Sequence, residues 1–359
     1  MRDYIESSVI AVLACLFCIW LFKPLAIRIG LVDRPSSRKL HAHEPPLIGG
    51  IAIFFGFCFA LLHLHVSLQP YRSLLAGSSV LILMGIVDDF HDLSARFRLL
   101  GQVMVALMLT SWGGLVLQNL GDILFLGDIK LLLWGLPFTL LLVVTNLNAM
   151  NMIDGQDGLA GSIALGQTLW LLVFSHILHL QSLELLLIIL AMLLVVFLCF
   201  NMCFPWRKQA SIFLGDSGST FLAFLLIWAA IQLANQGVIK PIEILWVLAL
   251  PLFDMGNVII YRIRCGFSIF RAGRDHGHHV LERLGFSKMT STNVLFLISG
   301  MLGGVGYGLY QFQISEGISF VAFVASFGVY LLVLEFMRFF TKESHTEMTF
   351  SVDVEQHVP

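Results

Sequence analysis

The chain has 359 residues, of which 58% are hydrophobic and 12% are charged, and its mean hydropathy is +0.87. Soluble domains contain about 45–50% apolar and about 25% charged residues, so this composition excludes a soluble protein and indicates an integral membrane protein. The formal net charge of −2 gives no indication of nucleic-acid binding. The six cysteines lack the spacing of a zinc site or a disulfide framework, so we interpret them as packing residues.

Candidate membrane spans follow from the apolar segments, because a helix needs about 20 apolar residues to cross the bilayer core. The sequence predicts eleven of them, roughly at 7–29, 47–66, 72–88, 99–118, 129–148, 158–178, 182–203, 216–233, 241–262, 292–312 and 317–339. The first is too long for a signal peptide and lacks a small-x-small cleavage site, so we expect it to be retained. Since lipid offers no partner for unpaired backbone groups, we expect an all-α polytopic membrane protein.

The basic residues predict the orientation. With eleven spans, one side of the membrane holds 17 of the 21 Lys and Arg residues and the other side holds 4. By the positive-inside rule the first side is cytoplasmic, so the N-terminus lies outside and the C-terminus inside. We expect residues 1–340 to form a single transmembrane domain, and the polar tail 341–359 to be disordered in the cytoplasm.

Acidic residues gather in the connections predicted to be cytoplasmic, in loops near 31–46, 88–98, 148–158, 204–216 and 263–291. A carboxylate at membrane depth costs about 2.5–3.5 kcal/mol on insertion scales, so each one needs a structural or functional reason. Because the carboxylates converge on one face, the sequence predicts a single cytoplasmic active site.

The segment GIVDDFHDLSARFR (85–98) ends the third span with the adjacent carboxylates Asp88 and Asp89. Neighbours on a helix point about 100° apart, so we expect one to face the site and the other to support it by hydrogen bonding. Carboxylates at a helix C-terminus oppose the macrodipole, which favours a functional role over a solvated helix end. Arg96 and Arg98 are either topology signals or phosphate clamps.

The segment NAMNMIDGQDGLAG (148–161) places Asn148, Asn151 and Asp154 at three-residue spacing, on one stripe if the preceding helix continues. Asp157 follows between two glycines. An EF-hand loop is excluded because the twelfth position counted from Asp154 is not Glu. A plain turn would not need the two upstream amides. These oxygen ligands suit Mg²⁺ or Mn²⁺ held together with substrate phosphates.

The segment SIFLGDSGST (211–220) leads into the eighth span. One interpretation is that Asp216 or Ser217 simply caps the helix N-terminus. The functional interpretation is compatible with it: a glycine-flanked helix start exposes N–H groups to phosphate, while Asp216 binds a metal ion.

The longest cytoplasmic connection, 262–292, carries His276, His278 and His279 among several arginines. Zinc is a weak interpretation because H-x-H-H has no partner cysteines here. Imidazoles beside arginines suit phosphate oxygens, and the basic residues also suit anionic lipid headgroups. The apolar residues within 267–270 would allow the loop to lie on the membrane surface.

Asp254 lies inside the ninth predicted span, in PLFDMGN (251–257). Two interpretations are equally open for this carboxylate: a buried structural partner for another helix, and a residue of the site. No internal repeat, Walker motif, nucleophile elbow or Rossmann fingerprint is present in the sequence.

Taken in chain order, DD (88–89), NxxNxxDGxDGLAG (148–161), LGDSGST (214–220) and HGHH (276–279) resemble the motifs of the polyprenyl-phosphate N-acetylhexosamine-1-phosphate transferase family. The resemblance covers about residues 25–290. PLIGG, PLFDM and RDHGHH look like the bacterial branch that uses UDP-N-acetylglucosamine and undecaprenyl phosphate. The lipid I-forming translocase has three consecutive histidines instead, and the eukaryotic dolichol-phosphate enzymes replace both DGxDG carboxylates.

The resemblance implies a role for each motif residue. Asp88 and Asp89 match the acidic pair, one of which is proposed to deprotonate the polyprenyl phosphate. Asn151 and Asp216 match the positions that hold the catalytic Mg²⁺. The implied substrate-binding residues are Arg98 near the lipid phosphate, Asn148 and Asp157 near the nucleotide-sugar, Asp154 beside them, and Arg274, His276, His278 and His279 near the sugar and pyrophosphate.

The implied reaction is Mg²⁺-dependent, with Mn²⁺ as the alternative ion. It transfers N-acetylglucosamine-1-phosphate from UDP-N-acetylglucosamine to undecaprenyl phosphate and releases UMP. Its place would be the bacterial inner membrane, as the first membrane step of O-antigen or a related surface polysaccharide, and relatives are often homodimers. The alternatives are another UDP-N-acetyl-hexosamine, or a transporter of nucleotide-sugars or lipid-linked sugars. Transporters bind near the midplane in repeated halves, which this sequence does not show.

Overall fold

The structure is a computed structural model that describes residues 2–33, 44–64, 67–203, 207, 209–269 and 273–355. These residues form helices joined by short connections, and within them β-structure is limited to isolated bridges such as the one between Leu47 and Phe213. The all-α polytopic architecture predicted from composition is confirmed for this part of the chain.

The helices lie where the apolar segments predict them. They are α1 (Arg2–Ile29), α2 (Gly49–His63), η1 (Gln69–Tyr71), α3 (Arg72–His91), α4 (Ala95–Leu107), η2 (Met108–Trp112), η3 (Leu132–Trp134), α5 (Gly135–Ile153), α6 (Leu159–Ile177), α7 (Gln181–Asn201), α8 (Gly215–Ala234), α9 (Pro241–Val247), α10 (Ala249–Arg264), α11 (Gly277–Arg283), α12 (Lys288–Gln311) and α13 (Glu316–Glu355).

Eight helices of the described chain are long and apolar enough to cross a membrane, or nine if α9 and α10 together make one span. That pair is bent by 76°, because Pro251 has no N–H to continue the hydrogen-bond ladder of α9. The apolar helix α2 has 15 residues, and α4 ends in the π turn η2. A helix is thus present at each of the eleven predicted segments. The number of helices that cross the membrane stays a prediction.

The core is built around α8, which packs against α2, α3, α5 and α6. Of the apolar window of α8, 89% is buried, and a helix buried on every side is apolar on every side, as FLAFLLIWAAI shows. By contrast, 17% of the apolar window of α13 is buried, so this helix lies at the periphery.

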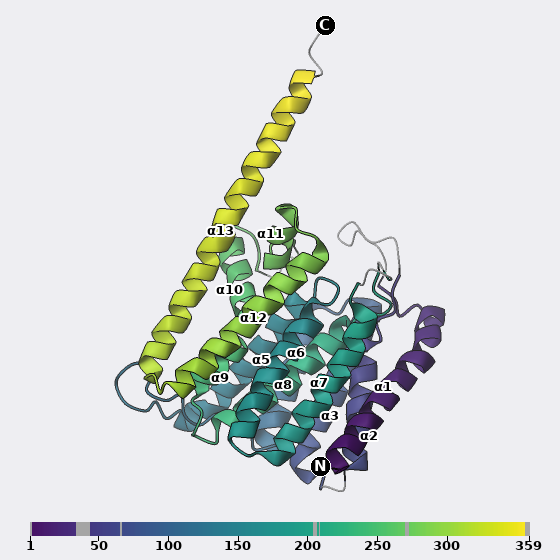
Figure 1. The fold of residues 1–359 in the computed structure, drawn as a ribbon, viewed down its shortest axis with the longest axis vertical. Coiled ribbons are helices and arrows are strands. Elements are labelled where there is room, and N and C mark those ends of the chain that lie inside the picture. The colour runs from purple at the N-terminus through teal and green to yellow at the C-terminus, as the bar shows by residue number, and fades with distance from the viewer. Residues whose placement is uncertain are drawn as a thin grey trace.

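Figure 1 shows the helices side by side in a bundle, with the N-terminus at the lower end and α11 at the upper end. The upper end is the side predicted to be cytoplasmic. The helix α13 extends beyond the other helices and is helical to Glu355, well into the tail 341–359 for which the sequence predicts disorder. The domain boundary at residue 340 stays a prediction.

Candidate active site

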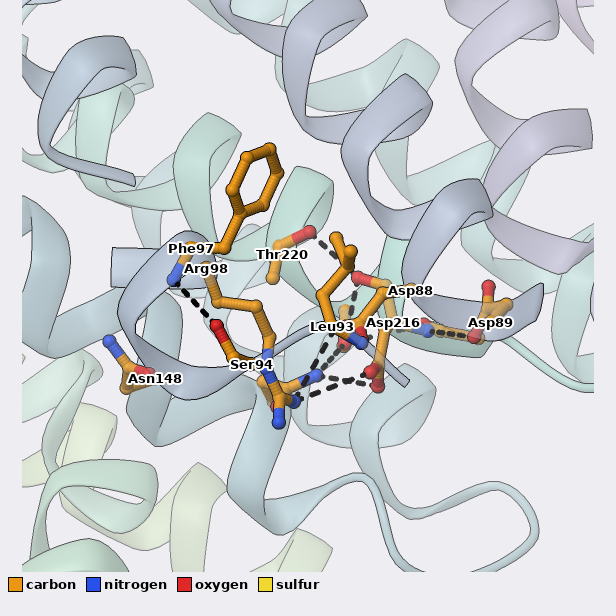
Figure 2. A network of polar contacts seen from close by, with 12 residues as sticks. Asp88, Asp89, Leu93, Ser94, Phe97, Arg98, Asn148, Asp216 and Thr220 are labelled. Atoms are coloured by element: carbon orange, nitrogen blue, oxygen red, sulfur yellow. Dashed lines mark hydrogen bonds and ion pairs between the residues drawn. The ribbon is translucent and has the colours of Figure 1, made fainter. Parts of the chain in front are cut away.

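Four helix ends, those of α3, α4, α5 and α8, meet in an acidic centre, which we define as Asp88, Asp89, Asn151, Asp216 and Arg98. Asp88 lies in the last turn of α3, and Asp216 and Arg98 lie in the first turns of α8 and α4. An Nη1 atom of Arg98 is 3.4 Å from Oδ2 of Asp88 and 3.8 Å from Oδ2 of Asp216. The two carboxyls lie within hydrogen-bonding reach of each other. Figure 2 shows the guanidinium joined to both carboxyls, with Asp89 turned to the opposite side.

The two adjacent carboxylates have different partners, as expected from their helical spacing. Oδ1 of Asp88 accepts from the backbone N–H of Leu93 at 2.7 Å, and Asp88 is buried. Oδ1 of Asp89 accepts from the backbone N–H of Asp216 at 3.1 Å. Its other oxygen, Oδ2, is buried and makes no hydrogen bond within the described chain. Asp88 therefore faces Arg98 and the carboxyl of Asp216, whereas Asp89 binds the start of α8.

The N-terminus of α8 is not capped by the side chain of Asp216 or Ser217. The helix begins at Gly215, and Leu214 before it provides no side-chain cap, so Asp216 lies inside the first turn. The backbone of Gly215 has a φ of +77°, and a Cβ there would lie 2.7 Å from Oδ2 of Asp89. The prediction that Asp216 or Ser217 caps the helix is therefore wrong: Asp89 binds the exposed N–H group, and the Asp216 side chain points to the acidic centre.

Asn151 connects α5 to the acidic centre. Its Nδ2 donates to Oδ1 of Asp216 at 2.9 Å and to Oγ of Ser219 at 3.0 Å. Both amide protons are thus used, and the carbonyl oxygen Oδ1 is the atom with which Asn151 can bind a cation. The pairing of Asn151 with Asp216, 65 residues apart, follows the sequence prediction that the two share a site.

The acidic centre fits a divalent cation by its chemistry. Two carboxyls, those of Asp88 and Asp216, share a single guanidinium, and one buried oxygen of the neighbouring Asp89 has no hydrogen bond in the described chain. Among the described residues no group of three or more His, Cys, Asp or Glu side chains is arranged to hold a metal ion. The protein therefore offers a few oxygen ligands and no closed cage, which is the mode typical of Mg²⁺ bound together with substrate phosphates.

The helix α5 ends at Ile153, and Asp154 follows it with φ −76° and ψ 60°. Asn148 and Asn151 therefore share a helical stripe, and Asp154 lies just beyond it. Nδ2 of Asn148 donates to Oε1 of Gln102 on α4 at 2.7 Å, so this amide joins two helices. Figure 2 shows Asn148 apart from the network that joins Arg98 to the carboxyls.

The loop after Asp154 is fixed by two other helices. Nε2 of Gln156 donates to Oγ1 of Thr292 at 3.0 Å, which ties the loop to α12. The thiol of Cys203, just after α7, donates to Oδ2 of Asp157 at 3.4 Å. Burial and then the nearby Asp157 charge raise the pKa of this thiol, so it keeps its proton and can donate. These contacts with α12 and Cys203 fix the position of the loop that carries Asp154 and Asp157.

The histidine segment, residues 274–279, lies against this loop. A Cβ added to Gly155 would lie 2.7 Å from Nε2 of His278, so the two motifs touch although 123 residues separate them. Both ring nitrogens of His278 are buried and make no hydrogen bond within the described residues. Burial and then the neighbouring His279 lower the pKa of His278 to about 3, so the ring is neutral.

Arg274 and His279 meet at a carboxylate that the sequence analysis does not place in the site. Glu282 lies 3.4 Å from Nη2 of Arg274 and 3.1 Å from Nδ1 of His279. Burial lowers the pKa of His279 despite this contact. Glu282 therefore holds an exposed guanidinium and a largely buried imidazole next to His278.

Comparison with known proteins decides the family. Glycosyl transferase family 4 matches residues 71–234. The Undecaprenyl-phosphate alpha-N-acetylglucosaminyl 1-phosphate transferase of Yersinia pestis is 33% identical over 312 residues, which is 86% of this chain and 85% of that protein. The chain belongs to the polyprenyl-phosphate N-acetylhexosamine-1-phosphate transferase family. The predicted resemblance is confirmed.

Other members of this transferase family are similarly related. The protein of the same name from Escherichia coli K12 is 32% identical over 319 residues, 86% of this chain and 84% of that protein. That of Pasteurella multocida is 33% identical over 330 residues, 90% of this chain and 91% of that protein. The match to Glycosyl transferase family 4 includes the acidic centre, whereas the histidine segment lies beyond its C-terminal limit.

Some residues around the site of this family member are not identified by the sequence analysis. Ser219, Gln102 and Glu282 each bind a predicted site residue. Ser219 lies inside the LGDSGST motif and Glu282 inside the loop near 263–291, three residues from Asp216 and His279 respectively, so their positions are a sequence signal. Gln102 is 46 residues from its partner, so helical spacing could not reveal it.

Asp254 is the residue for which the sequence left two interpretations. It is buried in α10 and binds His276 over 2.7 Å. It is therefore a structural partner, as one interpretation proposes, but its partner is the histidine segment itself.

Proposed function

We propose that this protein transfers N-acetylglucosamine-1-phosphate from UDP-N-acetylglucosamine to undecaprenyl phosphate and releases UMP. One observation carries the proposal. The acidic centre and the histidine segment lie on either side of the C-terminal end of α5, in a chain about one-third identical to transferases of that name. Carboxylates, amide oxygens and imidazoles gathered at one end of the bundle suit a reaction between two phosphates.

The reaction exchanges one pyrophosphate bond for another. An oxygen of the lipid phosphate forms a bond to the β-phosphorus of the nucleotide-sugar. The bond from that phosphorus to the oxygen bridging the two phosphates breaks, and UMP leaves with the electron pair. Little net energy is required, so catalysis consists mainly of positioning the phosphates and neutralising their charge.

Asp88 is our candidate for the base that removes the proton of the lipid phosphate. Its Oδ2 contacts Arg98, the residue we expect to bind that phosphate, and the two groups lie 3.4 Å apart. Asp89 is less suited because Oδ1 binds the N–H of Asp216 and Oδ2 is buried. Asp89 then acts by holding α8, and through it Asp216, in place.

We propose Asn151 and Asp216 as the protein ligands of Mg²⁺, with Mn²⁺ as the alternative ion. When bound, the ion neutralises charge on the phosphate oxygens. The remaining side chains bind the nucleotide-sugar. They are Asn148, Asp154 and Asp157 on the side of the nucleotide, and Arg274, His276, His278 and His279 on the side of the sugar and pyrophosphate.

Purified full-length protein in detergent tests the proposal. With UDP-N-acetylglucosamine, a short polyprenyl phosphate and Mg²⁺, we expect UMP and lipid-linked sugar in equal amounts. UDP-N-acetylgalactosamine in place of the first substrate tests which sugar is preferred. Absence of UMP release together with sugar flux across vesicles would contradict the proposal and support the transporter alternative.

The cellular setting is also part of the proposal. We place the enzyme in the bacterial inner membrane with the active site and C-terminus in the cytoplasm, and its product in O-antigen or related polysaccharide synthesis. Labelling of cysteines introduced after α12 and before α13 from outside intact spheroplasts tests the orientation, because that connection is predicted to be external. Protection of these cysteines would reverse the orientation.

A further inference from the structure

Asp254 is a buried carboxylate that the proposed reaction does not use. Its side chain is 2% exposed. Oδ2 accepts from Nδ1 of His276 at 2.7 Å, and Oδ1 accepts from the backbone N–H of Gly277 at 2.7 Å. Oδ1 also accepts from the hydroxyl of Tyr330 on α13 at 3.0 Å. A buried carboxylate needs several hydrogen bonds to offset the loss of its hydration. Asp254 accepts three, and two of them come from the histidine segment.

These two contacts set the direction of the imidazoles. Because Nδ1 of His276 faces Asp254, Nε2 is the ring atom that a ligand can reach. The N–H of Gly277 is the first of α11, so Asp254 also binds the N-terminus of that helix from outside. His278 and His279 follow in the first turn of α11. The ring of His278 lies 4.1 Å from that of His279 and is stacked on that of His276 at 5.7 Å.

Asp275, the residue before the first of the three histidines, is bound by a side chain of α13. The guanidinium of Arg338 donates to the carbonyl oxygen of Asp275 at 2.7 Å and lies 4.2 Å from the centre of the Tyr261 ring. On the other side, Nε of Arg262 is 3.3 Å from Oδ2 of Asp275. Residues 275–277 are therefore held between α10 and α13 at successive positions.

Gly277 packs directly against Tyr330 and Asp254. A Cβ at this position would lie 2.7 Å from the hydroxyl of Tyr330 and 3.2 Å from Oδ1 of Asp254. The backbone thus approaches α10 and α13 as closely as glycine allows. Although α13 is largely unburied, two of its polar side chains, Tyr330 and Arg338, make contacts with Asp254 and with this loop.

We propose that Asp254, Tyr330 and Arg338 are positioning residues that aim the histidine segment at the pyrophosphate of the nucleotide-sugar. The last apolar helix then takes part in catalysis through this loop, in addition to anchoring the chain. The inference rests on the proposed function, because it takes the pyrophosphate as the ligand of His276.

Asp254→Asn tests the inference with little change of volume. The amide of Asn has one acceptor and one donor, so when its oxygen accepts from Gly277 its NH2 faces Nδ1 of His276 and imposes the opposite ring tautomer, with the proton on Nε2. We expect kcat for UMP release to fall about 10²-fold, the loss that a misplacement of about 1 Å produces. Tyr330→Phe should lower kcat several-fold. The matched control is Tyr310→Phe on α12, where the ring contacts Phe174 and kcat should stay at the wild-type value.

A double-mutant cycle separates positioning from general stability. In a His276→Ala background, Asp254→Asn should lower kcat much less than in the wild type, because the two act as one unit. Equal losses in both backgrounds, or a thermal unfolding midpoint that falls in step with kcat, would overturn the inference. If Asp254→Asn does not fold, Tyr330→Phe replaces it in the same cycle.

The outcomes also separate the two proposals. Wild-type protein that releases no UMP overturns the proposed function and the inference with it. An active wild type whose Asp254→Asn and Tyr330→Phe variants both keep the wild-type kcat overturns the inference alone.

Discussion

Asp88 and Asp89 follow each other in α3 but bind different parts of the protein. Asp88 accepts from the N–H of Leu93, five residues further along the chain, and its other oxygen, Oδ2, lies 3.4 Å from Nη1 of Arg98. Asp89 accepts from the N–H of Asp216, 127 residues away, at 3.1 Å. The difference assigns the carboxyl of Asp88 to the contact with Arg98 and the carboxyl of Asp89 to the start of α8.

This difference predicts distinct phenotypes for the two amide variants. Asp88→Asn should lower kcat by about 10²- to 10⁴-fold, the usual contribution of a general base, with an unchanged unfolding midpoint. Asp89→Asn should lower both kcat and the unfolding midpoint, because the N-terminus of α8 loses a charged partner. UMP release and thermal unfolding in detergent measure the two effects.

The same variants test whether Asp88 instead forms a phospho-enzyme. Radiolabelled nucleotide-sugar without lipid would then leave label on wild-type protein and none on Asp88→Asn. We expect no label on either. An Asp89→Asn variant that is less active than Asp88→Asn but equally stable would exchange the roles of the two residues.

Asp216→Asn should lower turnover by about 10²- to 10³-fold at ordinary Mg²⁺ concentration, since it removes a charged ligand and the partner of Arg98. Excess Mg²⁺ should restore part of the activity. Binding of Mn²⁺, followed by its electron paramagnetic resonance signal without substrate, gives a second measurement and should weaken in parallel. Wild-type activity at ordinary Mg²⁺ would remove Asp216 from the metal site.

The sequence predicts the helices well because a membrane span is encoded locally by its hydropathy. It misses the 76° bend between α9 and α10, where both halves are apolar and only Pro251 marks the break. It predicts the motif residues but not their partners. Asp254 binds groups 22 and 76 residues away, and helical periodicity carries no information over that distance.

The glycines of the motifs illustrate the same limit. The structure uses Gly50 and Gly218 for a close crossing of α2 and α8, which the sequence alone does not reveal. A Cβ at Gly50 would lie 2.2 Å from the Cα of Gly218. The two glycines are 168 positions apart in the sequence. Their contact can therefore be recognised only in the folded helix bundle.

Gly50→Ala should therefore push α2 away from α8 and destabilise the protein by about 1–3 kcal/mol, as overpacking does elsewhere. Activity should fall as well, because Asp216 lies in the first turn of α8. The matched control is Gly308→Ala in α12, where a Cβ meets nothing within 4 Å. Thermal unfolding in detergent compares the two, and an equal midpoint for both variants would contradict the crossing.

His279→Ala should lower kcat/KM for the nucleotide-sugar strongly, since it removes a donor to the pyrophosphate and leaves Glu282 without one of its two partners. Arg274→Ala should act in the same direction but more weakly, because its side chain is half exposed and screened by water. Glu282→Gln, which removes the charge next to both side chains, tests how far their positions depend on this carboxylate. Unchanged kinetics in His279→Ala would leave the loop as a surface anchor only.

The buried His278 predicts how stability depends on pH. Its ordinary pKa of 6.5 applies to the unfolded chain, and burial lowers the folded value to about 3. Below pH 6.5 the unfolded state therefore binds a proton that the folded state does not, so stability is full above this pH and decreases as the pH falls toward 3. The unfolding midpoint should drop between pH 7.5 and 5.0, and the drop should be smaller in His278→Gln, whose side chain takes up no proton. Equal drops in both proteins would show that His278 does not cause the acid sensitivity.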